Sequence, residues 1–125
     1  MLRRYIYRLH DTISSRGYIN IEAFSFGNLP DKRSKIESRL TFPDGSLLDF
    51  YEVVFAYNRQ IIKGRYSYHY QDSSDKMVFR YDNAPHHPYI FTYPHHKHIG
   101  SAVEPSSNPD LGDVLSEIEE LMWAE

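Results

Sequence analysis

Histidines are concentrated in one short stretch of this chain. Residues 80–98, with the sequence RYDNAPHHPYIFTYPHHKH, hold five of the seven histidines together with three prolines. The imidazole side chain gains and loses a proton near neutral pH, and in its neutral form it also binds metal ions. The stretch therefore indicates proton transfer at a phosphate, a metal site, or a stiff polar loop without chemistry of its own.

Proton transfer would suit the cleavage of RNA. Attack by a 2′-hydroxyl needs one group that takes a proton, another that gives one, and cations around the phosphate. We expect His95, His96 or His98 to move the protons, with Arg65 or Arg80 beside the phosphate. Aromatic side chains of the same stretch could stack on unpaired bases: Tyr89, Phe91 and Tyr93.

A metal site is the second interpretation. Zinc needs three or four converging nitrogen, sulfur or oxygen ligands. In an extended segment His96 and His98 would point the same way, and His86 or His87 could close the site from the other end. The spacing H-H-x7-H-H-x-H matches no established metal motif, so we expect no metal and no other cofactor.

The third interpretation is purely structural. Pro85, Pro88 and Pro94 would stiffen a long loop, in which the histidines only bind backbone groups. We expect residues 85–98 to form a loop because proline cannot donate to a strand ladder. Long loops in small domains more often carry a function than not, which favours the first two interpretations.

The segments around this stretch alternate in ways that predict strands between two helices. Leu2, Ile6, Leu9 and Ile13 form one apolar helical stripe, and Asn108 and Pro109 suit the start of a second helix. Strands are expected at residues 18–26, 35–42, 46–57, 61–71 and 76–84. Short links require antiparallel neighbours, so we predict an α+β fold: an antiparallel meander of about five strands, with the N-terminal and C-terminal helices packed on one face.

Turn positions predict how these strands pair. A loop at Pro43-Asp44-Gly45 would place Arg39 opposite Asp49, and a loop at Asp72-Ser73-Ser74-Asp75 would place Arg65 opposite Asp82. The polar sheet face should carry Arg39, Asp49, Tyr51, Lys63, Arg65, His69, Arg80 and Asp82. Glu52 does not fit the apolar face on which its strand places it. It should lie opposite either Tyr66 or Arg65 and is a functional candidate in both cases.

Composition limits the classes of protein that the chain can belong to. Cysteine is absent, which excludes disulfides and thiolate metal sites. No apolar run is long enough to cross a bilayer, so we expect a cytoplasmic protein that does not contact a membrane. The net charge of −3 is compatible with an RNA partner and does not require one. We treat residues 1–125 as a single domain.

Several of these motifs resemble one known family. YSYHYQD, VFRYDNAPHHPY, FTYPHHKHIG and NPDLGDVLSEIEEL are similar to the TumE family of small prokaryotic proteins, as is the upstream RLTFPDGSLLDFYE. The resemblance extends from about residue 36 to 121. It implies the toxin of a type II toxin–antitoxin pair, with a small helix-turn-helix antitoxin as partner. Many toxins of this size cleave mRNA, so RNA cleavage is an analogy within that implication.

Together these arguments give a set of candidate residues and two rival functions. The candidate catalytic residues are Glu52, Arg65, Arg80, His86, His87, His95, His96 and His98. The candidate substrate-binding residues are Arg39, His69, Tyr81, Asp82, Asn83 and Lys97. We expect metal-independent RNA cleavage. The rivals are a protein that binds nucleic acid or metal without catalysis and an interaction protein that uses its acidic C-terminal helix. A homodimer is compatible with all of them.

Overall fold

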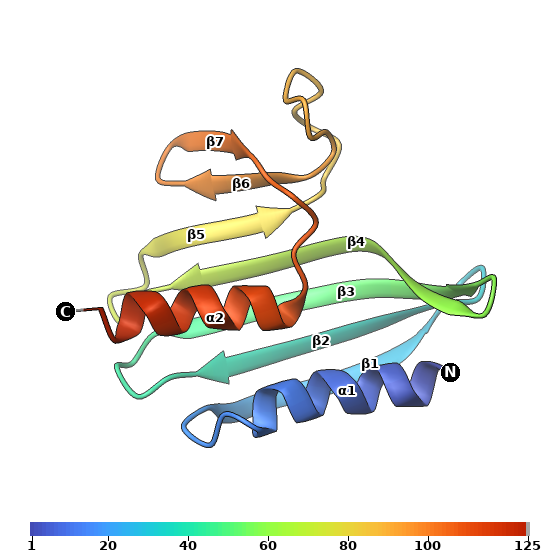
Figure 1. Cartoon of the computed structure of the whole chain (residues 1–125), viewed down its shortest axis with the longest axis horizontal. Coiled ribbons are helices and arrows are strands. Elements are labelled where there is room, and N and C mark those ends of the chain that lie inside the picture. Colours follow the sequence, from blue (N-terminus) through green and yellow to red (C-terminus); the bar gives the residue numbers. More distant parts are fainter. Residues whose placement is uncertain (125) are drawn as a thin grey trace.

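A computed structural model, which describes residues 1–124, shows one antiparallel sheet with two helices on one of its faces (Figure 1). The seven strands lie in sequence order. The elements are α1 (Leu2–Ser14), β1 (Asn20–Leu29), β2 (Arg33–Thr41), β3 (Leu47–Tyr57), β4 (Gln60–Gln71), β5 (Met77–Asp82), β6 (His96–Ile99), β7 (Ala102–Pro105) and α2 (Leu111–Met122). The α+β class, the meander and the two terminal helices are confirmed.

The expectation of about five strands is too low by two. Strands β6 and β7 form a short hairpin, and β6 begins inside the segment that we expected to be an irregular loop. The proline argument holds only as far as Pro94, because His96, Lys97 and His98 each have a backbone N–H and pair with β5. This difference matters for function, since it fixes His96 and His98 on a strand.

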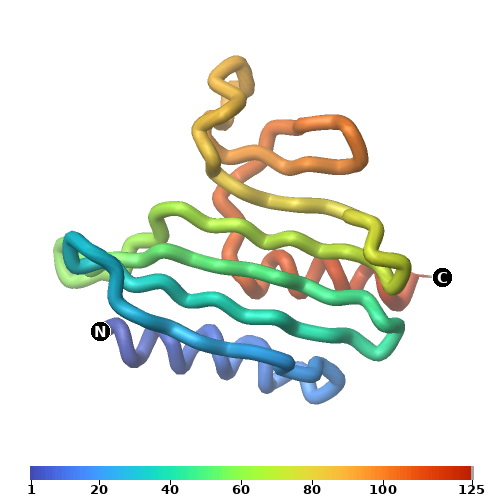
Figure 2. Tube along the Cα trace, turned by 180° about the vertical axis from the view of Figure 1, so that it is seen from behind, coloured from blue at the N-terminus to red at the C-terminus, as the bar shows by residue number. Residues whose placement is uncertain are grey.

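The helices divide the sheet into a covered face and an open face. Both helices lie on the same side, and Figure 2 shows the sheet from the uncovered side. The helices bury their apolar stripes against the sheet: Ile6, Leu9 and Ile13 from α1, and Leu111, Val114, Leu115 and Ile118 from α2. Tyr66, Tyr68, Tyr70 and Phe79 fill the sheet side of this core. Within residues 1–124, the structure shows no helix long and apolar enough to cross a membrane.

Helix α2 begins later than the sequence predicts. The N-cap is Asp110, not Asn108: the Asp110 side chain accepts from the Asp113 backbone N–H, and the Asp113 side chain accepts from the Asp110 N–H. This reciprocal pair satisfies two backbone donors that the first turn leaves free. Asn108 has no comparable partner three residues further on, because Leu111 is apolar.

One of the two predicted registers is correct. Phe42 donates its N–H to the Ser46 carbonyl, and Arg39 pairs with Asp49, as the turn at Gly45 requires. The β4–β5 register is shifted by two residues, so Asp82 lies opposite Ser67 and not opposite Arg65. The cause is a shorter turn, closed between Asp72 and Lys76, together with an irregularity in the ladder beside Tyr70.

Candidate functional site

Polar side chains on the open face of the sheet form two rows that cross the strands. Their order follows from the ladder pairings, because directly paired residues lie on the same face. The first row is Arg39, Asp49, His69, Arg80 and His98, and the second is Glu37, Tyr51, Ser67, Asp82 and His96. The strand pairing thus brings together side chains that are up to about sixty positions apart in the sequence.

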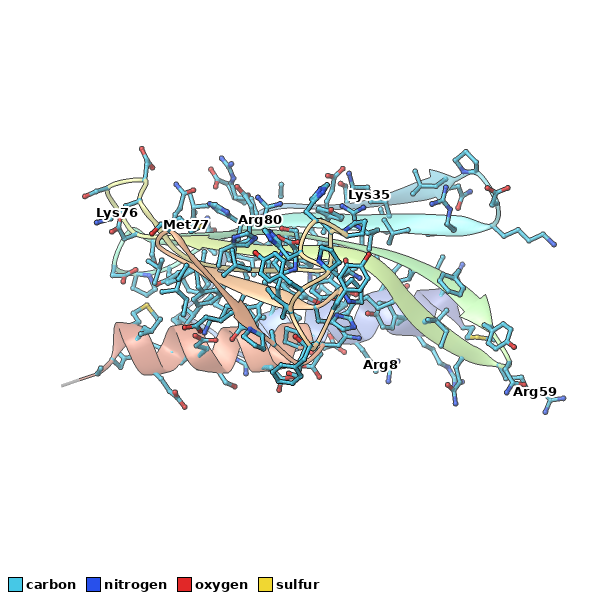
Figure 3. All side chains as sticks on the ribbon, turned by 90° about the horizontal axis from the view of Figure 1, so that it is seen from above. Arg8, Lys35, Arg59, Lys76, Met77 and Arg80 are labelled. Carbon is cyan, nitrogen blue, oxygen red and sulfur yellow. The ribbon has the colours of Figure 1, made fainter. Side chains whose placement is uncertain are left out.

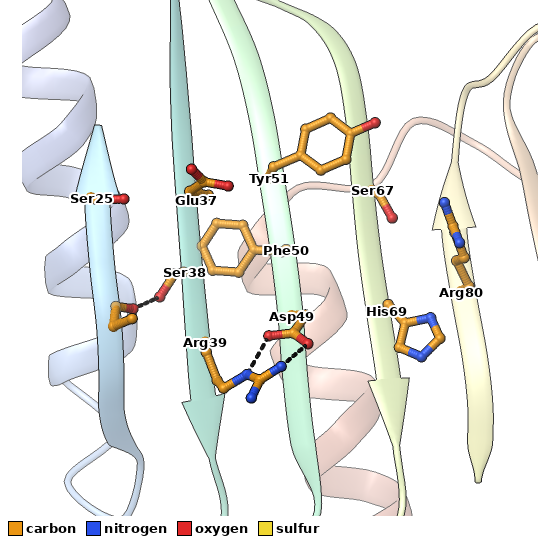
Figure 4. A pocket seen from close by; sticks show the side chains of 11 residues that line it. Ser25, Glu37, Ser38, Arg39, Asp49, Phe50, Tyr51, Ser67, His69 and Arg80 are labelled. Carbon is orange, nitrogen blue, oxygen red and sulfur yellow. Dashed lines mark hydrogen bonds and ion pairs between the residues drawn. The ribbon is translucent and has the colours of Figure 1, made fainter. Parts of the chain in front are cut away.

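The first row passes through an open groove of about 450 Å³ (Figure 4). His69 and Arg80 line the end of this groove that lies nearer the histidine segment. At the other end, the Arg39 guanidinium donates two hydrogen bonds of 2.8 Å each to the Asp49 carboxylate. Figure 3 shows Arg80 on the side of the sheet away from the helices, so this cation faces the open surface.

Beyond Arg80 the two rows end in a group of three imidazoles and one carboxylate. We call His87, His96, His98 and Asp82 the histidine cluster. The Nε2 atom of His96 lies 2.9 Å from Asp82 Oδ1, and the Nε2 atom of His98 lies 3.4 Å from Asp82 Oδ2. Potential ligand atoms of the three histidines all lie within 4.8 Å of one another. The cluster therefore offers ligands for a metal ion as well as groups for proton transfer.

Asp82 is the centre of this cluster and is almost completely buried. Its carboxylate accepts a hydrogen bond of 2.9 Å from the Ala84 backbone N–H, which fixes its orientation. Arg80 Nε lies 3.0 Å from Asp82 Oδ2, while the Arg80 side chain remains 42% exposed. The exposed guanidinium is therefore held in place by a buried charge and remains accessible to an anion from the solvent.

His96 is too deeply buried to touch a large substrate. Only 2% of the residue is exposed. Its Nδ1 atom lies 2.9 Å from the Pro94 carbonyl oxygen, which can only accept, so Nδ1 carries the proton. The Nε2 atom then faces Asp82. His96 positions the carboxylate, whereas His98 is the more accessible of the two.

Burial and neighbouring charges lower the pKa of the two accessible histidines of the first row. The pKa of His69 lies below its usual range mainly because the ring is desolvated, and the Arg80 charge lowers it further. Asp49, on the neighbouring strand, acts in the opposite direction. Desolvation also lowers the pKa of His98, against the attraction of Asp82. The neutral form of His69 is thereby favoured, whereas in His98 the Asp82 charge opposes desolvation and favours the protonated form.

Several predicted site residues lie away from this surface. His95 shares a hydrogen bond of 2.9 Å with the Tyr66 hydroxyl on the helix side of the sheet. Lys97 and Tyr81 both bind Glu117 of α2 on that side. Arg65 and His86 are exposed and belong to neither row. Asn83 has a structural role, because its side chain bonds the backbone of Tyr66 and Gly64.

Glu52 is buried in the helix layer and not in the groove. It lies opposite Tyr66, the first of the two predicted arrangements, and accepts hydrogen bonds from the Tyr5 and Tyr68 hydroxyls. Lys63, expected on the polar face, donates to Tyr68 and to the Pro109 carbonyl instead. A bulge at 64–65 in β4 breaks the alternation and turns Lys63 toward the helices.

Among the groove residues that sequence reasoning left out of the candidate site are Glu37, Tyr51 and Ser67. The alternation of β3 did place Tyr51 on the polar face, and this signal was available from the sequence. The alternation of β4 likewise placed Ser67 on the same face as His69, but its position next to Asp82 depends on the shifted β4–β5 register. Glu37 becomes part of the groove only through the pairing of β2 with β3.

The fold and the site define a class of small α+β protein with a helix-covered core on one face and a histidine- and arginine-rich surface on the other. A family model described as toxin TumE matches residues 6–122, and the chain belongs to this toxin family. The match is wider than the resemblance seen in the sequence motifs and includes most of α1. A toxin family implies an antitoxin partner. No curated protein and no solved structure matches the chain.

Proposed function

We propose that this toxin cleaves RNA on the open face of the sheet, at a centre formed by His69, Arg80 and His98. The observation that carries the proposal is their order in one cross-strand row, in which an imidazole lies on each side of a guanidinium. A phosphate bound by Arg80 would have a proton-transfer group on either side. This narrows the sequence-based expectation, since His95 lies on the other face and His96 is buried.

The proposed reaction uses the 2′-hydroxyl of the RNA as nucleophile. His69 removes the hydroxyl proton, and the 2′-oxygen attacks the adjacent phosphorus. The bond from phosphorus to the 5′-oxygen breaks, and His98 supplies a proton to that oxygen from its protonated form, which the neighbouring Asp82 carboxylate favours. Arg80 stabilises the charge on the phosphate oxygens during the transfer. The products are a 2′,3′-cyclic phosphate and a 5′-hydroxyl.

The groove supports the proposal because it gives single-stranded RNA a path to this centre. Arg39 lies along the same row as Arg80, and Tyr51 offers a ring on which a base can stack. The loop before β6 adds exposed aromatic side chains next to the histidine cluster: Tyr89, Phe91 and Tyr93. The short polar groove accommodates unpaired nucleotides better than a rigid duplex.

An RNA-cleavage assay with untagged protein tests this function. We expect cleavage that resists EDTA and falls by roughly 10²–10⁴-fold when His69 or His98 is replaced by alanine. His86→Ala is the matched control, because His86 belongs to the same histidine segment but is exposed and lies outside both rows. Absence of cleavage by a folded sample, or equal loss in the control, would contradict the proposal.

Binding without cleavage is the second candidate function, and the exposed aromatics favour it. Phe91 is 88% exposed and Tyr89 is 75% exposed, which is costly for a protein surface without a partner. This alternative predicts salt-sensitive RNA binding with no product and no dependence on His98. An electrophoretic shift assay and a product analysis on the same samples separate the two functions.

The partner and the location follow from the same proposal. We infer a type II arrangement, in which a helix-turn-helix antitoxin binds the toxin directly, and a cytoplasmic site of action, since cellular RNA lies there. Co-purification of the toxin with the product of an adjacent gene tests the partner. A purified antitoxin that leaves RNA cleavage unchanged would contradict the inference.

A further inference from the structure

The histidine cluster has the donor set of a transition-metal site. His87 comes from the loop between β5 and β6, His96 and His98 come from β6, and Asp82 comes from the end of β5. The three rings meet edge to face, with centroids 4.8 Å apart for His87 and His96 and 4.9 Å apart for His96 and His98. Such close packing of three imidazoles, two of them beside one buried carboxylate, needs a physical reason.

The hydrogen-bond partners of His96 give such a reason. Its Nδ1–H is used by the Pro94 carbonyl, so in the neutral ring the Nε2 atom presents a lone pair. That lone pair lies 2.9 Å from an oxygen of the Asp82 carboxylate, which also presents lone pairs. Two acceptors at this distance need a cation between or beside them, either a proton or a metal ion.

The surroundings are those that ligating histidines usually have. A metal-bound imidazole commonly donates its second N–H to a backbone carbonyl or a polar side chain, which fixes the ring. His96 makes this contact with Pro94, and the His87 Nδ1 atom lies 2.9 Å from the Tyr89 hydroxyl. The Nε2 atoms of His96 and His98 already approach one carboxylate.

The ligand atoms of the three histidines need to move only slightly closer together to bind one metal ion. Zinc–nitrogen bonds of about 2.0–2.1 Å in a tetrahedron place the ligand atoms roughly 3.4 Å apart. The histidine ligand atoms lie within 4.8 Å of one another, so movements on the order of 1 Å close the set. His87 lies on a loop and can make the largest of these movements. Three imidazoles and one carboxylate suit zinc, cobalt or nickel and do not suit magnesium or calcium.

We propose that the histidine cluster binds one divalent transition-metal ion, most favourably zinc, through His87, His96, His98 and Asp82. Metal binding does not depend on RNA cleavage, and only the inhibitory role of the ion rests on the proposed function. The ion would join the loop to β6 and β5. It would also occupy the His98 nitrogen that the proposed reaction uses, so the metal-bound form is a reversibly inhibited form of the toxin.

Metal binding is measured directly on the untagged full-length chain. Isothermal titration with zinc chloride, and absorption spectra with cobalt chloride, should show one ion per chain and the visible bands of a tetrahedral site. Zinc should also raise the Tm, because an ion that binds only the folded state stabilises it. Absence of saturable binding, or a cobalt spectrum that remains octahedral, would overturn the proposal.

Two neighbouring histidines provide a matched pair of variants. His87→Ala should weaken zinc binding by more than the roughly 10–100-fold that loss of an outer-shell partner costs, whereas His86→Ala should leave it unchanged. His98→Ala, on a different element, is a second ligand variant in case the loop change alters folding. Equal affinity in His87→Ala and the native chain would overturn the assignment of the ligands.

The RNA assay distinguishes a failure of this inference from a failure of the proposed function. Zinc should reduce cleavage by the native chain, and His87→Ala should keep its cleavage and lose most of the zinc effect. Zinc binding without any RNA cleavage would support the metal site and contradict only the ribonuclease proposal. Cleavage that zinc leaves unchanged at saturation would overturn the inhibitory role of the ion.

Discussion

For His69, the sequence, the geometry and the electrostatics all support the proposed role in proton transfer. Its ring is faced by Asp49 from β3 and Arg80 from β5, and Gln71 lies on the same face of its own strand. Burial and Arg80 together lower its pKa, which keeps the ring neutral and able to accept a proton. A neutral imidazole beside a guanidinium is what a base next to a bound phosphate requires.

Replacement of Arg80 should therefore shift the titration of His69. The positive charge disfavours the protonated ring, so Arg80→Gln should raise the His69 pKa, whereas Asp49→Asn should lower it further. NMR titration of the ring protons measures both changes. In the native chain the midpoint should lie below the usual value of about 6.5. A native midpoint at or above that value, or shifts of the same sign in both variants, would contradict this account.

Glu52 shows how a residue with the features of a catalytic group can have a structural role. It is 1% exposed, and its carboxylate joins Tyr5 of α1 to Tyr68 of β4. Its partners would be left without an acceptor in Glu52→Ala, which should lower the free energy of unfolding by about 2–3 kcal/mol. Urea denaturation measures this loss. Cleavage per folded molecule should not change, because Glu52 lies on the face opposite the groove.

The control for Glu52 is another glutamate of the sheet. Glu37 lies on the open face with its side chain 57% exposed, and its replacement by alanine should change stability by no more than about 0.5 kcal/mol. A loss of stability in Glu37→Ala equal to that in Glu52→Ala would mean that the buried contacts are not the cause. A loss of cleavage in a fully folded Glu52→Ala protein would return Glu52 to the catalytic candidates.

Individual elements also differ from their sequence-based description in ways that can be measured. The capping box places the start of α2 at Asp110, whereas the sequence pattern favoured Asn108. Asp110→Ala should lower the free energy of unfolding by about 1 kcal/mol, because the Asp113 backbone N–H loses its acceptor. Asn108→Ala should have little effect. Urea denaturation compares the two, and the reverse order of effects would show that the helix begins at Asn108.

Strand β6 is the element that most changes the functional interpretation. On an irregular loop the histidines could adopt many arrangements, and none would be favoured as a reaction centre. The β5–β6 ladder instead pairs His98 with Arg80 and His96 with Asp82. The alternation of β6 then sends Lys97 to the opposite face, where it binds Glu117.

At the scale of the whole molecule, the two faces of the sheet have different roles. The covered face holds the core and the buried Glu52 network, and the open face holds the polar rows and the groove. In Figure 3, Lys35 and Arg80 lie on the open side, and Arg8 lies on the helix side. A protein with a net charge of −3 can therefore still present cations to RNA on one side.

Salt dependence should identify the face that contacts RNA. Replacement of Lys35 by glutamine should reduce the slope of log affinity against log salt concentration by about 0.7, the value for one phosphate contact on a single strand. Arg8→Gln removes the same charge from the helix side and should leave the slope unchanged. Fluorescence anisotropy with single-stranded RNA measures both. An equal effect of the two changes would contradict binding to the open face.

Local patterns in the sequence determined the fold class, both helices, most strand positions and the tight turn at Gly45. These features depend on periodicity and on turn geometry over a few residues, which any single segment carries by itself. The sequence also identified the histidine segment and Arg80 as candidates for chemistry. It could not choose between proton transfer and metal binding, because both use the same side chains.

Only the tertiary structure decided which candidate residues lie next to one another. A two-residue shift in the β4–β5 ladder placed Ser67 opposite Asp82, and a bulge in β4 turned Lys63 away from the open face. Pairing of β6 with β5 separated His98 from its sequence neighbours His95 and Lys97. Register and bulges result from the packing of the whole sheet against two helices. No single segment contains that information. The sequence therefore identified candidate residues of the site but not their arrangement in space.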